Sequence, residues 1–360
     1  MVNAALSKIR LRDLMRAARA RDASDLHLAG GEPPGLRIDG TLLRLDSPAL
    51  DDGELECIAA SLLGETGLER LRTLGDADGL VHDGELGTFR VHAFRAGGRV
   101  RLALRALSRE IPTFEGLGLP LMLQTFAERH AGLALFVGPT GSGKSTALAA
   151  LIDRINRSAA RHILTLEDPV EYRHRAVRSS IAQRELGRDF FDYPSAIRSA
   201  LRANPDVIAI GELRDAAVIR AALGAAETGH LVLSTLHTGD ASSSVDRIVD
   251  AFEPAAQHAA RTVLAQTLVG IASLRLLPRE GGGRRAAVEI LLANDAVRSL
   301  IREGRTHQLR NAIVTGRNAG MQTLEAHLTE LVVRGEVTLE TARANAVRPD
   351  DVRTLAGAIA

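Results

Sequence analysis

The pattern of hydrophobic and polar positions changes near residue 110. Before that point, short amphipathic segments follow one another, some with helical spacing and some with apolar and polar residues in alternation. The helical segments are residues 6–20 and about 52–72, and the strand-like ones are 36–45, 87–94 and 99–107. Asp39-Gly40 and Gly97-Gly98 supply turn signals between strands. This half is predicted to be a small α+β domain, residues 1–108.

After residue 120, short and nearly all-apolar runs alternate with helical stretches. The runs are residues 133–137, 162–166, 207–210 and 231–236. Such runs are typical of strands buried on both faces, and their alternation with helices predicts a parallel, RecA-like α/β sheet over residues 121–360. From residue 255 onward the pattern predicts mainly helix, interrupted by a glycine-rich turn at 279–285. Two prolines and two glycines in residues 111–120 indicate an interdomain linker, placed at 109–120.

Composition narrows the class of protein. With 360 residues, 45% of them hydrophobic and 25% charged, the chain has the composition of a globular two-domain protein. A net charge of +1, 3% aromatic residues and no tryptophan argue against a nucleic-acid partner. The single cysteine, Cys57, lies in a helical pattern and is expected to be a buried apolar residue. No apolar run approaches the roughly 18 residues of a membrane span, and no signal peptide is recognisable, so a cytoplasmic location is expected.

The strongest chemical signal is the pattern G-x-x-x-x-G-K-[ST]. It is filled by Gly138, Gly143, Lys144 and Ser145, between an apolar strand and an amphipathic helix. In such a loop the backbone N–H groups point at phosphate oxygens, the lysine reaches the β- and γ-phosphates, and the serine ligates Mg²⁺. A chance match in a glycine-rich loop is the alternative, and the strand and helix around it weigh against that. The expected ATP-binding set is Gly138, Pro139, Thr140, Gly141, Ser142, Gly143, Lys144, Ser145 and Thr146.

Hydrolysis also needs carboxylates at strand ends near the loop. LEDPVEY (166–172) carries Glu167, Asp168 and Glu171, and spacing alone does not show which glutamate is the base. NPDVIAIGELRD (204–215) ends its apolar run at Gly211-Glu212 and resembles a Walker B motif. Many P-loop enzymes have aspartate where Gly211 stands, so Glu212 is expected to bind the metal partly through water. Each cluster could instead be a solvated loop or a helix cap.

Two histidines flank the last apolar run, His230 before it and His237 after it. An isolated histidine is more often structural than catalytic. Since His237 follows a strand of the same predicted sheet, it is expected to contact the γ-phosphate, and His230 is a weaker candidate for nucleotide binding. No third ligand lies near them in the sequence, which argues against a metal site.

The four segments, in this order and spacing, resemble the secretion-ATPase superfamily, which drives type II secretion and type IV pili. ASDLHL and GGEPPGLRIDG, near the N-terminus, resemble the entry to its PAS-like N-terminal domain. Three features favour the pilus retraction ATPases within it: a short chain, the lack of a four-cysteine motif, and AVRSLIRE (296–303). GMQTLEAHLTELVVRGEVT (320–338) fits the same subgroup, whereas Val297 and Ser299 depart from its pattern.

The resemblance implies a homohexameric motor that binds ATP and Mg²⁺ and acts on an inner-membrane pilus platform protein. It implies that Glu171 is the general base and that His237 reads the γ-phosphate. Arginines of the N-terminal domain would reach the nucleotide site, with Arg90 and Arg105 the best matches and Arg101 another candidate. The alternatives are an extension or secretion ATPase of the same fold, an accessory retraction motor, a RecA-like nucleic-acid motor, and a subunit that binds ATP without hydrolysing it.

Overall fold

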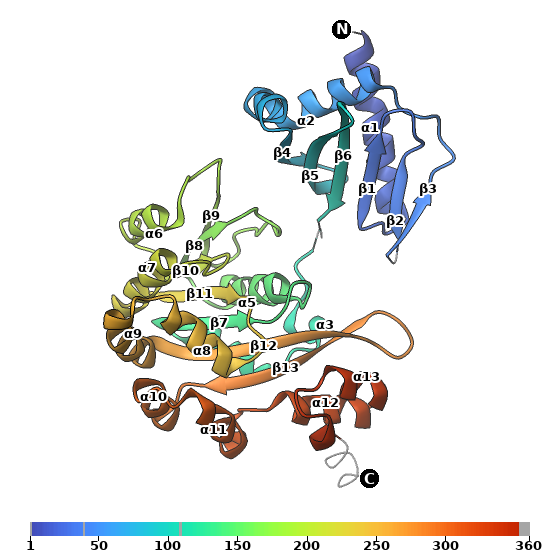
Figure 1. Ribbon diagram of the computed structural model, residues 1–360. Coiled ribbons are helices and arrows are strands. Elements are labelled where there is room, and N and C mark those ends of the chain that lie inside the picture. Colours follow the sequence, from blue (N-terminus) through green and yellow to red (C-terminus); the bar gives the residue numbers. More distant parts are fainter. Residues whose placement is uncertain (1, 39, 108–109, 353–360) are drawn as a thin grey trace. The chain divides into compact units, whose positions relative to one another are not determined.

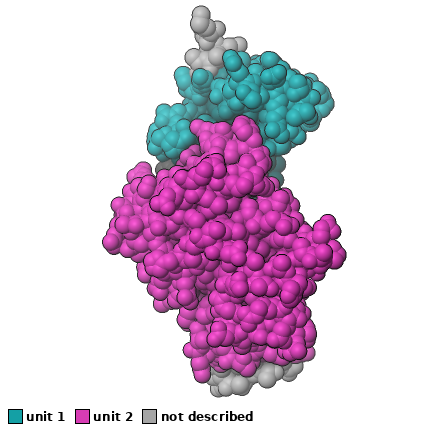
Figure 2. Space-filling model, turned by 90° about the vertical axis from the view of Figure 1, so that its left-hand side faces the viewer, with its two compact units in different colours: residues 1–110 teal, residues 111–360 magenta. Residues whose placement is uncertain are grey.

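The computed structural model describes the backbone of residues 2–38, 40–107 and 110–352 (Figure 1). Asp39, half of one predicted turn, lies outside these residues. The chain divides into two compact units, Met1–Glu110 and Ile111–Ala360, shown in different colours in Figure 2. Each unit has its own hydrophobic core.

Unit 1 is an antiparallel sheet with two long helices. Its elements are α1 (Val2–Ala20), β1 (Asp25–Ala29), β2 (Gly35–Ile38), β3 (Thr41–Arg44), α2 (Asp52–Thr73), β4 (Asp76–Asp83), β5 (Gly87–Ala96) and β6 (Arg99–Ala106). The six strands lie in the order β3-β2-β1-β6-β5-β4. Because side chains alternate along a strand, β5 and β6 bury Phe89, Val91, Leu102 and Leu104, which join the same core as residues of α1 and α2.

The predicted α+β domain is therefore confirmed, with two corrections. Strand β4 was missed, because its sequence, DADGLVHD, mixes acidic residues and glycine with few apolar ones; it forms by pairing with β5 along its whole length. Cys57 is exposed rather than buried. The buried face of α2 carries Leu55, Ile58 and Ala59, and position 57 points away from that stripe.

Unit 2 is a three-layer α/β structure (Figure 1). Its elements are α3 (Phe114–Leu117), η1 (Leu121–Gln124), α4 (Thr125–Glu128), β7 (Gly132–Val137), α5 (Lys144–Ser158), β8 (His162–Glu167), β9 (Ser180–Glu185), α6 (Tyr193–Leu201), β10 (Val207–Ile210), α7 (Ala216–Glu227), β11 (Leu231–Leu236), α8 (Ala241–Asp250), α9 (Pro254–Thr267), β12 (Leu268–Pro278), β13 (Arg284–Leu292), α10 (Asp295–Arg302), η2 (Thr306–Gln308), α11 (Leu309–Thr315), η3 (Arg317–Ala319), α12 (Leu324–Val333) and α13 (Leu339–Asn345). Over the residues described, no helix of either unit is both long and apolar enough to cross a membrane.

Seven strands form the sheet of unit 2, in the order β13-β12-β7-β11-β10-β8-β9. All neighbouring pairs are parallel except the β12–β13 hairpin. Successive residues of β7 face opposite sides: Leu133 and Leu135 pack in one core with α6–α9, and Ala134 and Phe136 pack in a second core with α3–α5. The four predicted apolar strands and their parallel arrangement are thus confirmed.

The prediction that the chain is mainly helical after residue 255 is wrong in one respect. Residues 268–292 form the long hairpin of β12 and β13, and the glycine-rich segment supplies its turn. Both strands are buried over most of their length. Apolar runs of this kind are ambiguous in sequence, and pairing of β12 with β7 decides in favour of strand.

The structure also differs from the predicted linker at 109–120. Residues from Ile111 onward group with unit 2. Thr113 caps α3, and Phe114 and Leu119 are buried in the same core as Phe136 of β7. The prolines and glycines therefore shape a packed segment of unit 2 rather than a spacer.

If residues 111–120 belong to the core, shortening Phe114 must destabilise unit 2. Phe114 is 2% exposed and Leu121 is 65% exposed. We expect Phe114→Ala to lower the free energy of unfolding by about 3 kcal/mol, because it leaves a cavity, and Leu121→Ala by less than about 0.5 kcal/mol. Denaturant unfolding of both variants measures this. Equal, small losses would show that the segment behaves as a linker.

Candidate nucleotide site

The phosphate loop connects the buried strand β7 to helix α5. Gly143, with φ +91°, occupies the N-cap, and α5 begins at Lys144. The first N–H groups of a helix have no partner within the helix and carry the positive end of its dipole. The loop and the first turn of α5 therefore form an anion-binding end built from backbone.

The start of the loop accepts only glycine. Gly138 has φ +145°, and a Cβ there would lie 2.4 Å from the carbonyl oxygen of Leu274 and 2.5 Å from the Ser142 hydroxyl. Leu274 belongs to β12, so the neighbouring strand fixes this turn. The Ser142 hydroxyl is itself buried and has no hydrogen-bond partner among the described residues.

Lys144 lies inside the loop. Its ammonium donates 2.9 Å hydrogen bonds to the carbonyl oxygens of Gly138 and Pro139, and the residue is 7% exposed. Burial lowers the pKa of Lys144, and the charges of Glu212 and Glu171 oppose that shift. Both predicted carboxylates are thus close enough to act electrostatically on the phosphate-binding lysine.

The carboxyl ends of β8, β10 and β11 bring further polar groups to the same edge. Arg214 links two of them: its guanidinium donates to Glu212 at 3.1 Å and to Asp168 at 3.0 Å. The Nε2 atom of His237 lies 3.5 Å from Glu212, and its Nδ1 atom lies 3.4 Å from the Thr140 hydroxyl. His237 therefore lies between the phosphate loop and Glu212.

The absence of an aspartate at Gly211 also has a steric reason. A Cβ at Gly211 would meet the Tyr193 hydroxyl at 3.3 Å and the Leu166 carbonyl oxygen at 3.4 Å, which is tight. The backbone of Gly211 pairs on both sides, donating to Leu166 and accepting from the Thr235 hydroxyl. A side chain at this position would require its neighbours to shift by a few tenths of an ångström, and Glu212 is the acidic residue that directly follows.

The two glutamates of the acidic loop (residues 167–174) differ in environment. Glu167 is half-buried, and its Oε1 atom accepts hydrogen bonds from Thr165 at 2.6 Å and Gln183 at 2.9 Å. Burial raises the pKa of Glu167, against those hydrogen bonds. Glu171 is exposed. The two glutamates thus differ: the Glu167 carboxylate is half-buried and hydrogen-bonded, whereas Glu171 is exposed.

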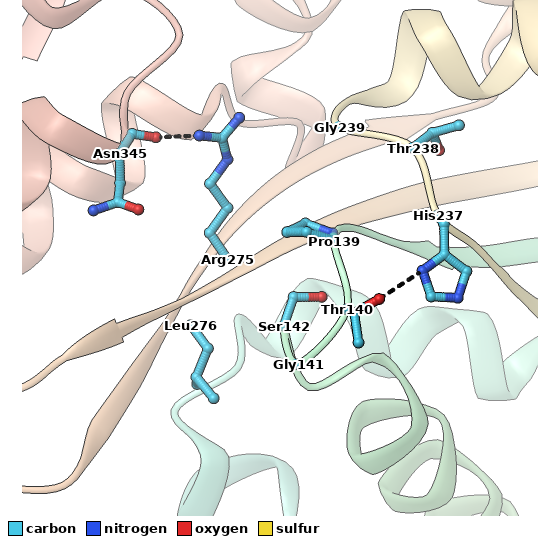
Figure 3. A pocket seen from close by; sticks show the side chains of 10 residues that line it. All are labelled: Pro139, Thr140, Gly141, Ser142, His237, Thr238, Gly239, Arg275, Leu276 and Asn345. Atoms are coloured by element: carbon cyan, nitrogen blue, oxygen red, sulfur yellow. Dashed lines mark hydrogen bonds between the residues drawn. The ribbon is translucent and has the colours of Figure 1, made fainter. Parts of the chain in front are cut away.

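A cavity of about 380 Å³ lies against the phosphate loop, within the size range of small-molecule sites. One wall is Pro139–Ser142, and the others come from His237–Gly239, from β12 and from the end of α13 (Figure 3). Arg275 of β12 points along the cavity and donates a 2.6 Å hydrogen bond to the Asn345 carbonyl oxygen (Figure 3).

Sequence reasoning missed several of these groups. Arg214 follows Glu212 by two residues and could have been noticed as a cation in the Walker B segment. Tyr172, whose hydroxyl lies 2.9 Å from the Thr146 hydroxyl, stands in the recognised acidic segment. No sequence signal pointed to Arg275, because β12 itself was not predicted.

Not every predicted residue is brought to this edge. His230 precedes β11, at the opposite end of a six-residue strand from His237, roughly 20 Å away. Its Nδ1 atom lies 3.1 Å from the Ala225 carbonyl oxygen, a structural contact.

The predicted arginines belong to unit 1. Arg90 and Arg105 face each other on β5 and β6, and Arg105 pairs with Asp25 at 2.8 Å. Arg101 lies 3.5 Å from Glu32 in the same unit. Their approach to the nucleotide stays a prediction.

The side-chain oxygens near the phosphate loop fit a Mg²⁺ ion that is held mainly by the nucleotide. Among the described residues, no group of three or more His, Cys, Asp or Glu side chains could hold a metal by itself. Mg²⁺ commonly binds through one or two protein oxygens, substrate phosphates and water. Ser145 is exposed in the first turn of α5, and Glu212 already has Arg214 and His237 as neighbours. Ser145 would thus be the direct ligand, and Glu212 would act through water.

Comparison with known proteins agrees with this geometry. The sequence profile of the family described as "Type II/IV secretion system protein" matches residues 99–348. The chain belongs to this family. The match takes in all of unit 2 up to α13 and begins at β6 of unit 1.

Within this family, the chain is similar to proteins of type IV pilus systems. The type IV pilus retraction ATPase PilT of Pseudomonas aeruginosa is 39% identical over 339 residues, which is 94% of this chain and 98% of the relative. The type IV pilus ATPase PilU of the same organism is 35% identical over 95% of this chain and 90% of its own length. A crystal structure of the pilus retraction motor PilT with bound ADP superposes with a TM-score of 0.89, at 42% identity, over 95% of this chain and 98% of that one.

The requirement for glycine at the start of the loop gives a test of the site. Gly138→Ala would place a methyl group 2.4 Å from the Leu274 carbonyl oxygen at a backbone angle that alanine avoids. We expect the affinity for a fluorescent ADP analogue to fall about 100-fold, corresponding to ~2.7 kcal/mol. Gly224→Ala, in α7 with no atom within 4 Å of the new Cβ, is the matched control and should bind normally. Unchanged binding by Gly138→Ala would place the nucleotide elsewhere.

Proposed function

We propose that this chain is an ATP-hydrolysing motor that retracts type IV pili. Membership of the family makes it an ATPase, and its similarity to PilT over nearly the whole length of both chains supports retraction as its work. The observation that carries the proposal is the convergence on one loop: Lys144 lies within the electrostatic reach of both Glu171 and Glu212, with His237 beside Glu212. Transfer of a phosphoryl group to water requires such a phosphate-binding lysine and acidic residues that position the water and support the metal.

Each residue has a role that its position supports. The loop backbone and Lys144 hold the β- and γ-phosphates, and Ser145 ligates Mg²⁺, which neutralises phosphate charge when bound. Glu171, exposed and close to Lys144, orients and deprotonates the attacking water. Glu212 supports the metal and that water, and His237, between Thr140 and Glu212, contacts the γ-phosphate. Glu171 is preferred to Glu167 as the base because the Glu167 Oε1 atom is already occupied by hydrogen bonds from Thr165 and Gln183, whereas Glu171 is exposed.

Hydrolysis would drive motion through the C-terminal helices. The segment AVRSLIRE covers α10 from its second residue to its C-cap, Glu303, with Val297 and Ile301 buried. Arg298 donates hydrogen bonds to the carbonyl oxygens of Gln266 at 2.8 Å and Leu268 at 3.0 Å. It therefore holds α10 to the point where α9 ends and β12 begins. Since β12 also carries Arg275 and contacts Gly138, this strand links the phosphate loop to α10.

The assembled motor would be a homohexameric ring in the cytoplasm, acting on a platform protein of the inner membrane at the pilus base. Arg90 and Arg105 of unit 1 would complete a nucleotide site, within one subunit or between neighbours. Loss of the γ-phosphate would then remove the charge that holds the closed arrangement, which is how other nucleotide switches release an ordered state.

The choice of base can be tested by substituting each glutamate in turn. We expect Glu171→Gln to lower kcat for ATP hydrolysis by about 10²- to 10³-fold, because the water loses its general base, while ADP affinity stays unchanged. Glu167→Gln should stay within a few-fold of wild type, since an amide oxygen can still accept from Thr165. Release of phosphate by purified protein measures both. The reverse ranking would assign the base to Glu167.

The direction of the motor is tested in cells. Deletion of the gene should leave abundant pili on cells that no longer twitch, because pili are extended but not withdrawn. The wild-type gene should restore twitching, and the Lys144→Ala variant should not, since it cannot hold the phosphates. A deletion strain without pili would instead identify an extension ATPase.

A further inference from the structure

After Glu167, whose carbonyl oxygen accepts from the Leu186 N–H, the backbone of the acidic loop is held by side chains. Among the described residues, the backbone groups of Val170, Tyr172 and His174 hydrogen-bond to side chains of β9. This strand is the edge of the sheet and pairs in parallel with β8 (Figure 1). The position of Glu171 therefore depends on β9.

Gln183 of β9 makes most of these contacts. Its amide Nε2 donates to Glu167 Oε1 at 2.9 Å and to the Tyr172 carbonyl oxygen at 2.8 Å, and its Oε1 accepts from the His174 N–H at 3.0 Å. One side chain thus binds the loop before, beside and after Glu171. Only a neutral amide offers two donors and an acceptor at one place.

The strand register explains why the amide fits. Gln183 lies opposite Thr165 in the β8–β9 pair, and Glu185 lies opposite Glu167. Glu185 adds a second support, accepting from the Val170 N–H at 3.1 Å. Both side chains of β9 therefore point at the chain that leaves β8.

The far side of the loop is tied to the phosphate-binding helix. The Tyr172 hydroxyl and the Thr146 hydroxyl are 2.9 Å apart, and Thr146 is two residues after Lys144. The Tyr172 side chain consequently connects the loop that carries Glu171 to the first turn of α5. The backbone carbonyl group of Tyr172 is held by Gln183.

We propose that Gln183 and Tyr172 are positioning residues for ATP hydrolysis, which set the distance between Glu171 and the phosphates. This rests on the proposed role of Glu171 as the base. Gln183 fixes the loop to the sheet, and Tyr172 fixes it to α5. Neither residue needs to touch the nucleotide: they act by keeping the general base in reach of the attacking water, and small displacements of such a group are costly in rate.

The experiment is a set of substitutions in the full-length protein, with kcat, KM and ADP affinity measured separately. Gln183→Leu, of similar size, removes all the amide contacts, and we expect kcat to fall about 10- to 100-fold with KM and ADP affinity within about threefold. Tyr172→Phe removes only the hydroxyl and should lower kcat less, about 3- to 10-fold; it keeps the test available if Gln183→Leu does not fold.

The control is Gln257→Leu on α9. The Gln257 amide is half-buried and also donates to a backbone carbonyl group, but it lies outside the acidic loop, so this variant should keep its kcat.

A double-mutant cycle separates positioning from loss of stability. If Gln183 acts through Glu171, then Gln183→Leu should lower kcat no further in a protein that already carries Glu171→Gln. Additive losses, or a rise in KM equal to the fall in kcat, would overturn the proposal. If Glu171→Gln lowers kcat but neither Gln183→Leu nor Tyr172→Phe does, the positioning role fails and the proposed function stands. If Glu171→Gln has no effect, the base is misassigned and the positioning role fails with it.

Discussion

The parallel alignment of β8, β10, β11 and β7 is the constraint on which the site depends. Ile210 lies beside Leu166 and Leu236 beside Val137, so these strands end at one edge of the sheet. Every segment that leaves a strand there, the phosphate loop included, reaches the same place. His230 precedes β11, so the same alignment places it at the opposite edge of the sheet, away from the site.

Cations and carboxylates already lie next to one another at this edge of the sheet without a nucleotide. Lys144 is buried, which disfavours its charged form, and the nearby carboxylates of Glu171 and Glu212 restore part of that loss. Arg214 in turn holds Asp168 and Glu212. The same carboxylates that stabilise the lysine are therefore the groups needed for water and metal, and a bound triphosphate would enter a network that already has cations placed for it.

Strand β12 connects this chemistry to the rest of unit 2. The Leu274 carbonyl oxygen restricts the start of the phosphate loop, and the next residue, Arg275, lines the cavity and binds the end of α13. At its beginning, β12 is held by Arg298 of α10. One strand thus contacts the phosphate loop, α13 and α10.

Much of this architecture is determined by the sequence itself. Short apolar runs that alternate with helical stretches predict buried parallel strands, and a glycine-rich loop between strand and helix is a local motif that is recognisable in the sequence. Where a segment becomes a strand only by pairing with another strand, the residue pattern did not predict it. Strand β4 exists through its pairing with β5, and β12 through its pairing with β7. Other features depend on contacts between residues that are far apart in the chain or on different strands. Examples are the burial of Phe114, the different environments of Glu167 and Glu171, and the hydrogen bonds of Arg275 and Gln183. Packing and hydrogen bonding between such residues are fixed only when the sheet assembles, and for that reason the tertiary structure alone decided them.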